Sequence, residues 1–129
     1  MLTVLGGQIR HPDAVVGVDV ASSDSSGQIL AESLGPDRVV TLPRLDRSPG
    51  FGEAVQAGLA SGVLRSDSDE MFDVEAVEWI WLLHDDSAPA PDCLQLLLEA
   101  AQEHPRAAIV SAAHYCCSMM YSFLRINNN

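Results

Sequence analysis

The stretch EWIWLLHDD, residues 78–86, joins a run of apolar residues directly to two aspartates. A short apolar run of this composition predicts a β-strand over 78–84, and the aspartates end it because buried carboxylates are costly. Trp79 and Trp81 are two residues apart, so they lie on the same face of the strand. We expect that face to pack against a helix.

The residues that follow predict such a helix. After the proline-containing turn SAPAPD, residues 87–92, four apolar side chains recur at helical spacing: Leu94, Leu97, Leu98 and Ala101. This spacing places them on one face of a helix, directed at the core. Pro105 lies just past the helix end, and AAIVSA, residues 107–112, predicts a further strand.

Strands and helices also alternate before residue 78. Strands are predicted over 14–20 and 38–42, and helices over 27–34 and 53–60. The strand over 14–20 is almost wholly apolar, as in a parallel sheet that is buried on both faces. The alternation implies βαβ units with right-handed crossovers, and therefore an α/β fold with a mostly parallel sheet.

The two earlier helices carry their own signals. The polar stretch 22–26 can cap the first helix, whose apolar side is expected to be Ile29, Leu30 and Leu34. Gly35 and Pro36 then end that helix. The second helix follows a loop over 45–52, has Val55 and Leu59 four residues apart, and is expected to stop at Gly62.

Composition excludes several functions. The chain has 129 residues, which suits one domain, and 47% of them are hydrophobic, which favours a folded chain. Acidic residues outnumber basic ones 18 to 7, so nucleic acid is not an expected partner. All basic side chains are arginines. Without lysine, P-loop and Schiff-base chemistry are excluded for this chain.

Cysteine usage and hydropathy indicate the compartment. Cys93, Cys116 and Cys117 have no zinc-site or disulfide spacing, so we expect free thiols in a reducing cytoplasm. No run approaches the roughly 18 apolar residues of a membrane span. We expect a cytoplasmic location, or the cytoplasmic face of a membrane in a longer parent protein. The acidic stretch 66–73 is expected to be a surface loop, because the glycine of a calcium loop is missing.

Acidic residues follow two predicted strands: Asp19 and Asp24 follow the first, and Asp85 and Asp86 follow the strand over 78–84. In open parallel sheets, ligands bind beyond the carboxyl ends of strands, so these acids are expected to border one cleft. Adjacent carboxylates need a compensating cation, and Mg²⁺ or Mn²⁺ would serve. The alternative is that Asp85 and Asp86 only cap a turn before the proline-rich loop.

Three motifs occur in a definite order along about residues 5–110: Asp19-x-x-Ser22-x-Asp24-x-Ser26, then Gly50-Phe51-Gly52, then His84-Asp85-Asp86-Ser87. In this order they resemble the donor-binding half of the family 2 glycosyltransferases. The resemblance implies the GT-A fold, an α/β, Rossmann-like and mostly parallel sheet with flanking helices, here incomplete. It also implies a nucleotide-diphosphate sugar as donor and an acceptor that is a polysaccharide, a lipid or a protein.

The resemblance assigns the nucleoside side of the donor to five residues. Asp19 matches the aspartate that contacts the base or ribose, and Asp24 matches the second acid of that turn. Gly50, Phe51 and Gly52 match the loop that lines the nucleotide site, where glycines allow close backbone approach. An ordinary strand-to-helix connection is the alternative for this loop.

The resemblance assigns the diphosphate side to Asp85 and Asp86, which match the DXD-type acids that hold Mg²⁺ or Mn²⁺. His84 could bind phosphate or join the metal, but we favour a structural role for it. The implied reaction is inverting transfer of the sugar to an acceptor hydroxyl. Its catalytic base is unknown, because the family carries that base in a later, acceptor-binding half.

The expected organisation is a partial nucleotide-sugar-binding domain over 1–113 and an atypical tail over 114–129, with truncation at both ends. Unpaired sheet edges would then favour self-association. Two alternatives stay open. The first is a catalytically incompetent fragment that acts as a structural or interaction module. The second is another metal-dependent nucleotidyl or sugar-phosphate transferase.

Overall fold

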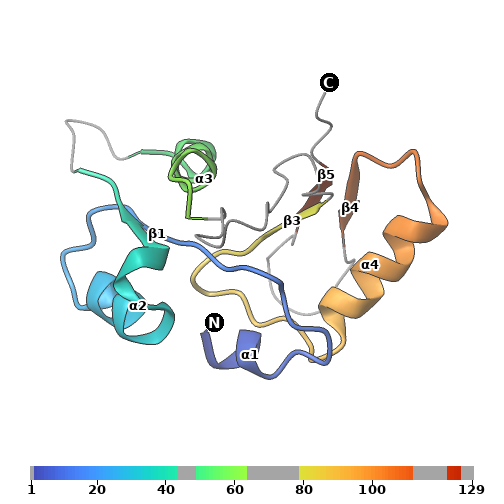
Figure 1. Cartoon of the computed structure of the whole chain (residues 1–129), viewed down its shortest axis with the longest axis horizontal. Coiled ribbons are helices and arrows are strands. Elements are labelled where there is room, and N and C mark those ends of the chain that lie inside the picture. Colours follow the sequence, from blue (N-terminus) through green and yellow to red (C-terminus); the bar gives the residue numbers. More distant parts are fainter. Residues whose placement is uncertain (1, 44–48, 64–78, 112–121, 126–129) are drawn as a thin grey trace, which may run out of the picture. The chain divides into compact units, whose positions relative to one another are not determined.

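The computed structural model describes residues 2–43, 49–63, 79–111 and 122–125. The chain divides into two compact units. The first unit combines Met1–Pro12 with Asp73–Asn129, and the second unit is Asp13–Phe72. Helices and strands occur in both, as Figure 1 shows, which agrees with the predicted α/β class.

The second unit contains a parallel pair of strands, β1 (Gly17–Asp19) and β2 (Val39–Thr41). They are joined through α2 (Ser26–Leu34) and a short 3₁₀ helix, η1 (Pro36–Arg38). Beyond the last pair of the register, the Leu42 N–H donates a hydrogen bond to the carbonyl oxygen of Asp19 at 2.8 Å. This is the βαβ unit that the alternating pattern predicted.

Helix α2 lies close to β1 because Gly17 has no side chain. A Cβ atom at Gly17 would be 3.1 Å from Leu34 Cδ1 and 3.3 Å from Leu30 Cδ2. Leu30 and Leu34 thus form the packed side of α2, as predicted, whereas Ile29 is 51% exposed. Gly35 ends α2 with φ of 93°, a left-handed conformation that favours glycine.

Helix α3 (Phe51–Ala60) begins two residues before the predicted start. The Glu53 carboxylate accepts a hydrogen bond from the Gly50 N–H at 2.8 Å, so the first turn is already closed at Gly50. Of the two apolar residues four apart, Leu59 is 41% exposed, and the buried residue of α3 is Gly58. A Cβ atom at Gly58 would lie 3.0 Å from Val18 Cγ2, so this glycine permits close contact with β1.

The first unit contains α1 (Leu2–Gly6), β3 (Trp79–Leu82), α4 (Cys93–Glu103), β4 (Ile109–Ser111) and β5 (Ser122–Arg125). Strand β5 lies between β3 and β4 and runs antiparallel to both (Figure 1). Strands β3 and β4 therefore point in the same direction. The sequence pattern predicted no strand over 122–125, within the expected tail.

The core of the first unit is the buried face of α4. Cys93, Leu94, Leu97 and Ala101 are buried, and Trp79, Trp81, Leu98 and Val110 pack against them. This confirms both the predicted helix face and the prediction that the two tryptophans pack on a helix. Cys93 is a free thiol, and burial raises its pKa.

Gln8 fixes the N-terminal segment to the start of α4. Its side chain is buried, its amide nitrogen donates to the Ala90 carbonyl at 2.8 Å, and its Oε1 accepts a hydrogen bond from the Leu94 N–H at 3.2 Å. The Ile9 N–H also donates to the Pro91 carbonyl at 2.7 Å. A helix start has unpaired N–H groups, and Gln8 satisfies one of them.

Several sequence predictions lie outside the described residues. They concern the acidic loop over 66–73, Cys116 and Cys117, and the tail apart from β5. Within the described part of the chain, no helix combines the length and the apolar character that a membrane crossing requires.

Replacing Gly58 by alanine tests the contact between α3 and β1. Alanine favours a helix over glycine by about 1 kcal/mol, but overpacking against a β-branched side chain costs about 1–3 kcal/mol. We therefore expect Gly58→Ala to lower the free energy of unfolding in urea. Gly52→Ala, on the same helix with no atom within 4 Å of the added Cβ, should be neutral or stabilising. Equal stability of the two variants would contradict the close packing.

Candidate functional site

The strongest candidate site is the acidic turn, defined here as His84, Asp85, Asp86 and Ser87, which follows β3. The Ser87 N–H donates to the His84 carbonyl at 3.0 Å, and the His84 N–H donates to Ser87 Oγ at 2.8 Å. These two bonds close a four-residue turn. The side chains of Asp85 and Asp86 are 87% and 57% exposed, so both carboxylates are open to water and ligands.

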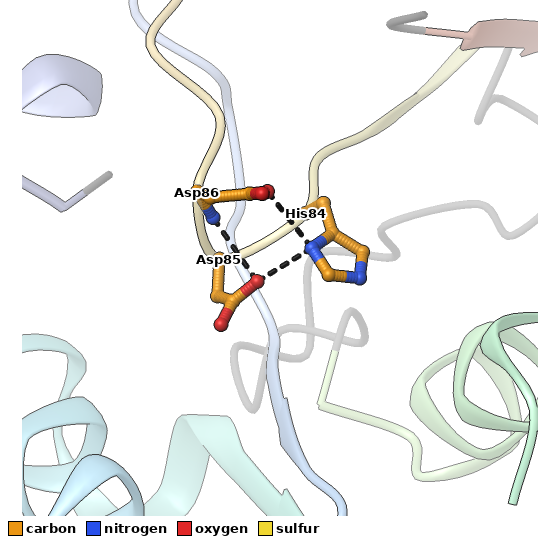
Figure 2. Close-up of side chains that lie close together, drawn as sticks. All are labelled: His84, Asp85 and Asp86. Atoms are coloured by element: carbon orange, nitrogen blue, oxygen red, sulfur yellow. Dashed lines mark hydrogen bonds and ion pairs between the residues drawn. The ribbon is translucent and has the colours of Figure 1, made fainter. Parts of the chain in front are cut away.

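The imidazole of His84 lies against both carboxylates (Figure 2). Its Nδ1 is 2.5 Å from Asp85 Oδ1 and 2.9 Å from Asp86 Oδ1. Because both neighbours are hydrogen-bond acceptors, Nδ1 carries a proton and donates it. The Asp86 N–H also donates to Asp85 Oδ1 at 3.0 Å, so Asp85 has the turn-capping contact that the simpler alternative predicted.

The acids raise the pKa of His84 above its ordinary value of 6.5. The hydrogen bond to Asp86 is the largest cause, the charges of Asp85 and Asp86 add to it, and slight burial acts in the opposite direction. The imidazolium form therefore persists to higher pH than in an ordinary histidine. Any stability from this pairing is present below the ordinary pKa and is lost as pH rises through the raised one.

The chemistry of the acidic turn suits a hard divalent cation. One ligand atom from each of His84, Asp85 and Asp86 lies within 4.8 Å of the others. Carboxylate oxygens are preferred by Mg²⁺ and Mn²⁺, which also keep several positions for water or phosphate. The exposure of both acids leaves room for those further ligands, so the residues present fit such an ion.

Asp19 ends β1 and is only 7% exposed. Its Oδ1 accepts a hydrogen bond from the Ser22 N–H at 3.3 Å, across a turn in which Ala21 has φ of 45°. A Cβ atom at Gly27 would lie 3.0 Å from Asp19 Oδ2. The carboxylate is thus held close to the start of α2, where the partial positive charge of the helix favours it.

Asp24 lies just before α2, within the stretch 22–26 that was expected to cap this helix. Asp24 Oδ1 accepts a hydrogen bond from the Ser26 N–H at 2.9 Å, whereas the N-cap residue Ser25 makes no side-chain cap bond. Hydrogen bonds from the Ser26 side chain and then its backbone lower the pKa of Asp24. This carboxylate therefore stays ionised to lower pH than usual.

The predicted Gly50-Phe51-Gly52 loop is mostly helical. Gly50 is the N-cap of α3, and Phe51 and Gly52 are its first two residues. The Phe51 ring is 51% exposed, and nothing lies within 4 Å of a Cβ built on Gly52. The second unit thus holds Asp19, Asp24 and this helix start, and the first unit holds the acidic turn.

Sequence reasoning gave no role to Ser87 or to Gly27. Ser87 is the last residue of the motif HDDS; it makes both hydrogen bonds that close the turn with His84, and it is buried. Gly27 supplies the space beside Asp19. A small polar residue directly after an acid pair, and a glycine at a helix start, were the available signals.

Asp86→Asn tests the cause of the raised pKa of His84. Removing the negative charge should lower that pKa toward its ordinary value, as measured by NMR titration of the imidazole resonances. Glu103→Gln removes the same charge at the far end of α4, and it should leave the pKa of His84 unchanged. If Asp86→Asn also left it unchanged, the hydrogen bond at 2.9 Å would not be the main cause.

Comparison with models of protein families gives a match over most of the chain. The model of the family described as Glycosyl transferase family 2 matches residues 6–128, nearly the whole chain, including β5 beyond the last residue of the resemblance noted above. No match was found among curated proteins or among solved structures. The GT-A fold is the fold of this family, and the α/β units described above agree with it. The chain therefore belongs to glycosyl transferase family 2.

Proposed function

We propose that the chain binds a nucleotide-diphosphate sugar through a divalent cation, for inverting transfer of the sugar to an acceptor hydroxyl. The observation that carries the proposal is the acidic turn. It presents two exposed carboxylates whose oxygens lie within 4.8 Å of each other, in a chain of this family.

Charge explains why a cation is needed. The chain has a formal net charge of −11, and Asp85 and Asp86 add their own repulsion to a diphosphate. Mg²⁺ or Mn²⁺ accepts one or two carboxylates together with phosphate oxygens, so it joins groups that otherwise repel each other. Asp86 and Asp85 would hold this ion. When bound, it would stabilise the charge that develops on the departing diphosphate.

The nucleoside is assigned to the second unit. Asp19 would accept hydrogen bonds from the base or ribose, and Asp24 would support the same turn. The exposed ring of Phe51 offers a stacking surface for a base, and Gly50 and Gly52 leave the backbone beside it open.

The acceptor is a hydroxyl of a polysaccharide, a lipid or a protein. Transfer needs a base that removes the proton of that hydroxyl. The proposal gives this role to no residue of the chain, so donor binding is its testable part.

Calorimetry with MnCl₂ and UDP or GDP tests the cation site. The nucleoside diphosphate should bind more tightly with Mn²⁺ than without it, and Asp86→Asn should weaken this metal-assisted binding by about tenfold or more. Glu103→Gln, which removes the same charge elsewhere in the first unit, should bind like the wild type. Equal nucleotide affinity in the wild type with and without Mn²⁺ would reject the cation site.

Asp19→Asn tests the nucleoside assignment separately. The amide keeps the size of the side chain but exchanges one acceptor oxygen for a donor, so its hydrogen bonds to a base or ribose must change. We expect the ratio of UDP to GDP affinity to change, while the gain from Mn²⁺ stays as in the wild type. An unchanged ratio would remove Asp19 from the nucleoside site.

A further inference from the structure

Ser87 is the buried member of the acidic turn. It is 2% exposed, whereas His84, Asp85 and Asp86 beside it are exposed. Its Oγ accepts the hydrogen bond from the His84 N–H at 2.8 Å, and its own N–H donates to the His84 carbonyl at 3.0 Å. The backbone of His84 is therefore bonded through both its N–H and its carbonyl to the same residue.

The loop after Ser87 restricts the position of this residue. Pro89 is also buried, and proline restricts its own backbone and that of the residue before it. At the far end of the loop, Gln8 holds the Ala90 carbonyl at 2.8 Å and the Leu94 N–H at 3.2 Å. Ser87 thus connects the acidic turn to a segment that is itself anchored on α4.

The acids need such a connection because they repel each other. Asp85 and Asp86 are adjacent, and the His84 ring that contacts both carboxylates is itself exposed to water. Rotation of the backbone at either acid would move the carboxylates apart and relieve the repulsion. A closed turn opposes that rotation, and of its two closing bonds the one to Ser87 Oγ depends on the side chain.

We propose that Ser87 is a positioning residue, whose buried hydroxyl holds the turn closed so that Asp85 and Asp86 face one cation. This inference rests on the proposed function, because it assigns Ser87 to the same cation site. Ser87 would contact neither the ion nor the donor. It acts through the backbone of His84, as outer-shell partners of metal ligands do.

Three variants test the inference. Ser87→Ala removes the acceptor and should weaken Mn²⁺-assisted UDP binding by about tenfold or more in calorimetry. Ser87→Thr keeps the hydroxyl and should restore most of the affinity. Ser61→Ala is the control for loss of a bonded serine hydroxyl, although Ser61 is exposed. Ser61 Oγ makes two comparable bonds, to the Gly58 carbonyl at 2.7 Å and from the Val63 N–H at 3.2 Å, but it carries no acid pair.

A second readout follows the turn itself. In ¹H–¹⁵N spectra of the Mn²⁺-free protein, Ser87→Ala should shift the His84, Asp85 and Asp86 amide signals and speed hydrogen exchange of the His84 N–H. A general loss of folding would instead shift signals throughout α4. Unchanged His84 exchange in Ser87→Ala overturns the inference, whatever the metal affinity.

The outcomes separate the inference from the proposed function. A wild type that gains no UDP affinity from Mn²⁺ rejects the cation site, and Ser87 then has no site to position. If the wild type gains affinity and Ser87→Ala gains as much, only the inference fails. If Ser87→Ala and Ser61→Ala lose affinity equally, the loss reflects stability, and the inference is again rejected.

Discussion

The structure depends on the burial of strand faces under helices. An apolar strand is stable only when a helix or another sheet removes it from water, and a carboxylate cannot follow it into the core without a partner. Strand β3 is covered by α4 through Trp79 and Trp81, and the acidic turn begins where that coverage ends. In the second unit, Asp19 ends β1 but stays buried, and the Ser22 N–H is a hydrogen-bond partner of its carboxylate. Packing therefore determines where the acids can be.

How closely a helix approaches its strand is decided by small residues. Gly17 and Gly58 leave space into which Leu34 and Val18, respectively, fit at close distance. A glycine contributes nothing to a hydrophobic pattern, so the pattern of apolar residues in α3 did not include Gly58. Gly58 lies against the side chains of Val18 and Val16, 3.0 and 3.6 Å from where its Cβ would be.

The acidic turn depends on both local and long-range hydrogen bonds. Its hydrogen bonds are local, within four residues, while its anchor is distant in sequence, since Gln8 reaches Ala90 and Leu94. His84 gives the acid pair a positive neighbour, and its pKa is raised for that reason. A site of this kind is open to solvent, suits a hard cation, and occurs in a family whose members transfer sugars.

The sequence by itself determined the α/β class, the elements from β1 to β4 within a few residues, the buried face of α4 and the family, because spacing and motif order are local properties. The tertiary structure decided the rest. The place of β5 between β3 and β4 depends on pairing across distant residues, and a strand of four residues has little pattern of its own. The early start of α3 depends on the Glu53 carboxylate, and the role of Ser87 depends on its burial. Hydrogen-bond partners and burial are set by which segments meet, and no window of sequence contains that information.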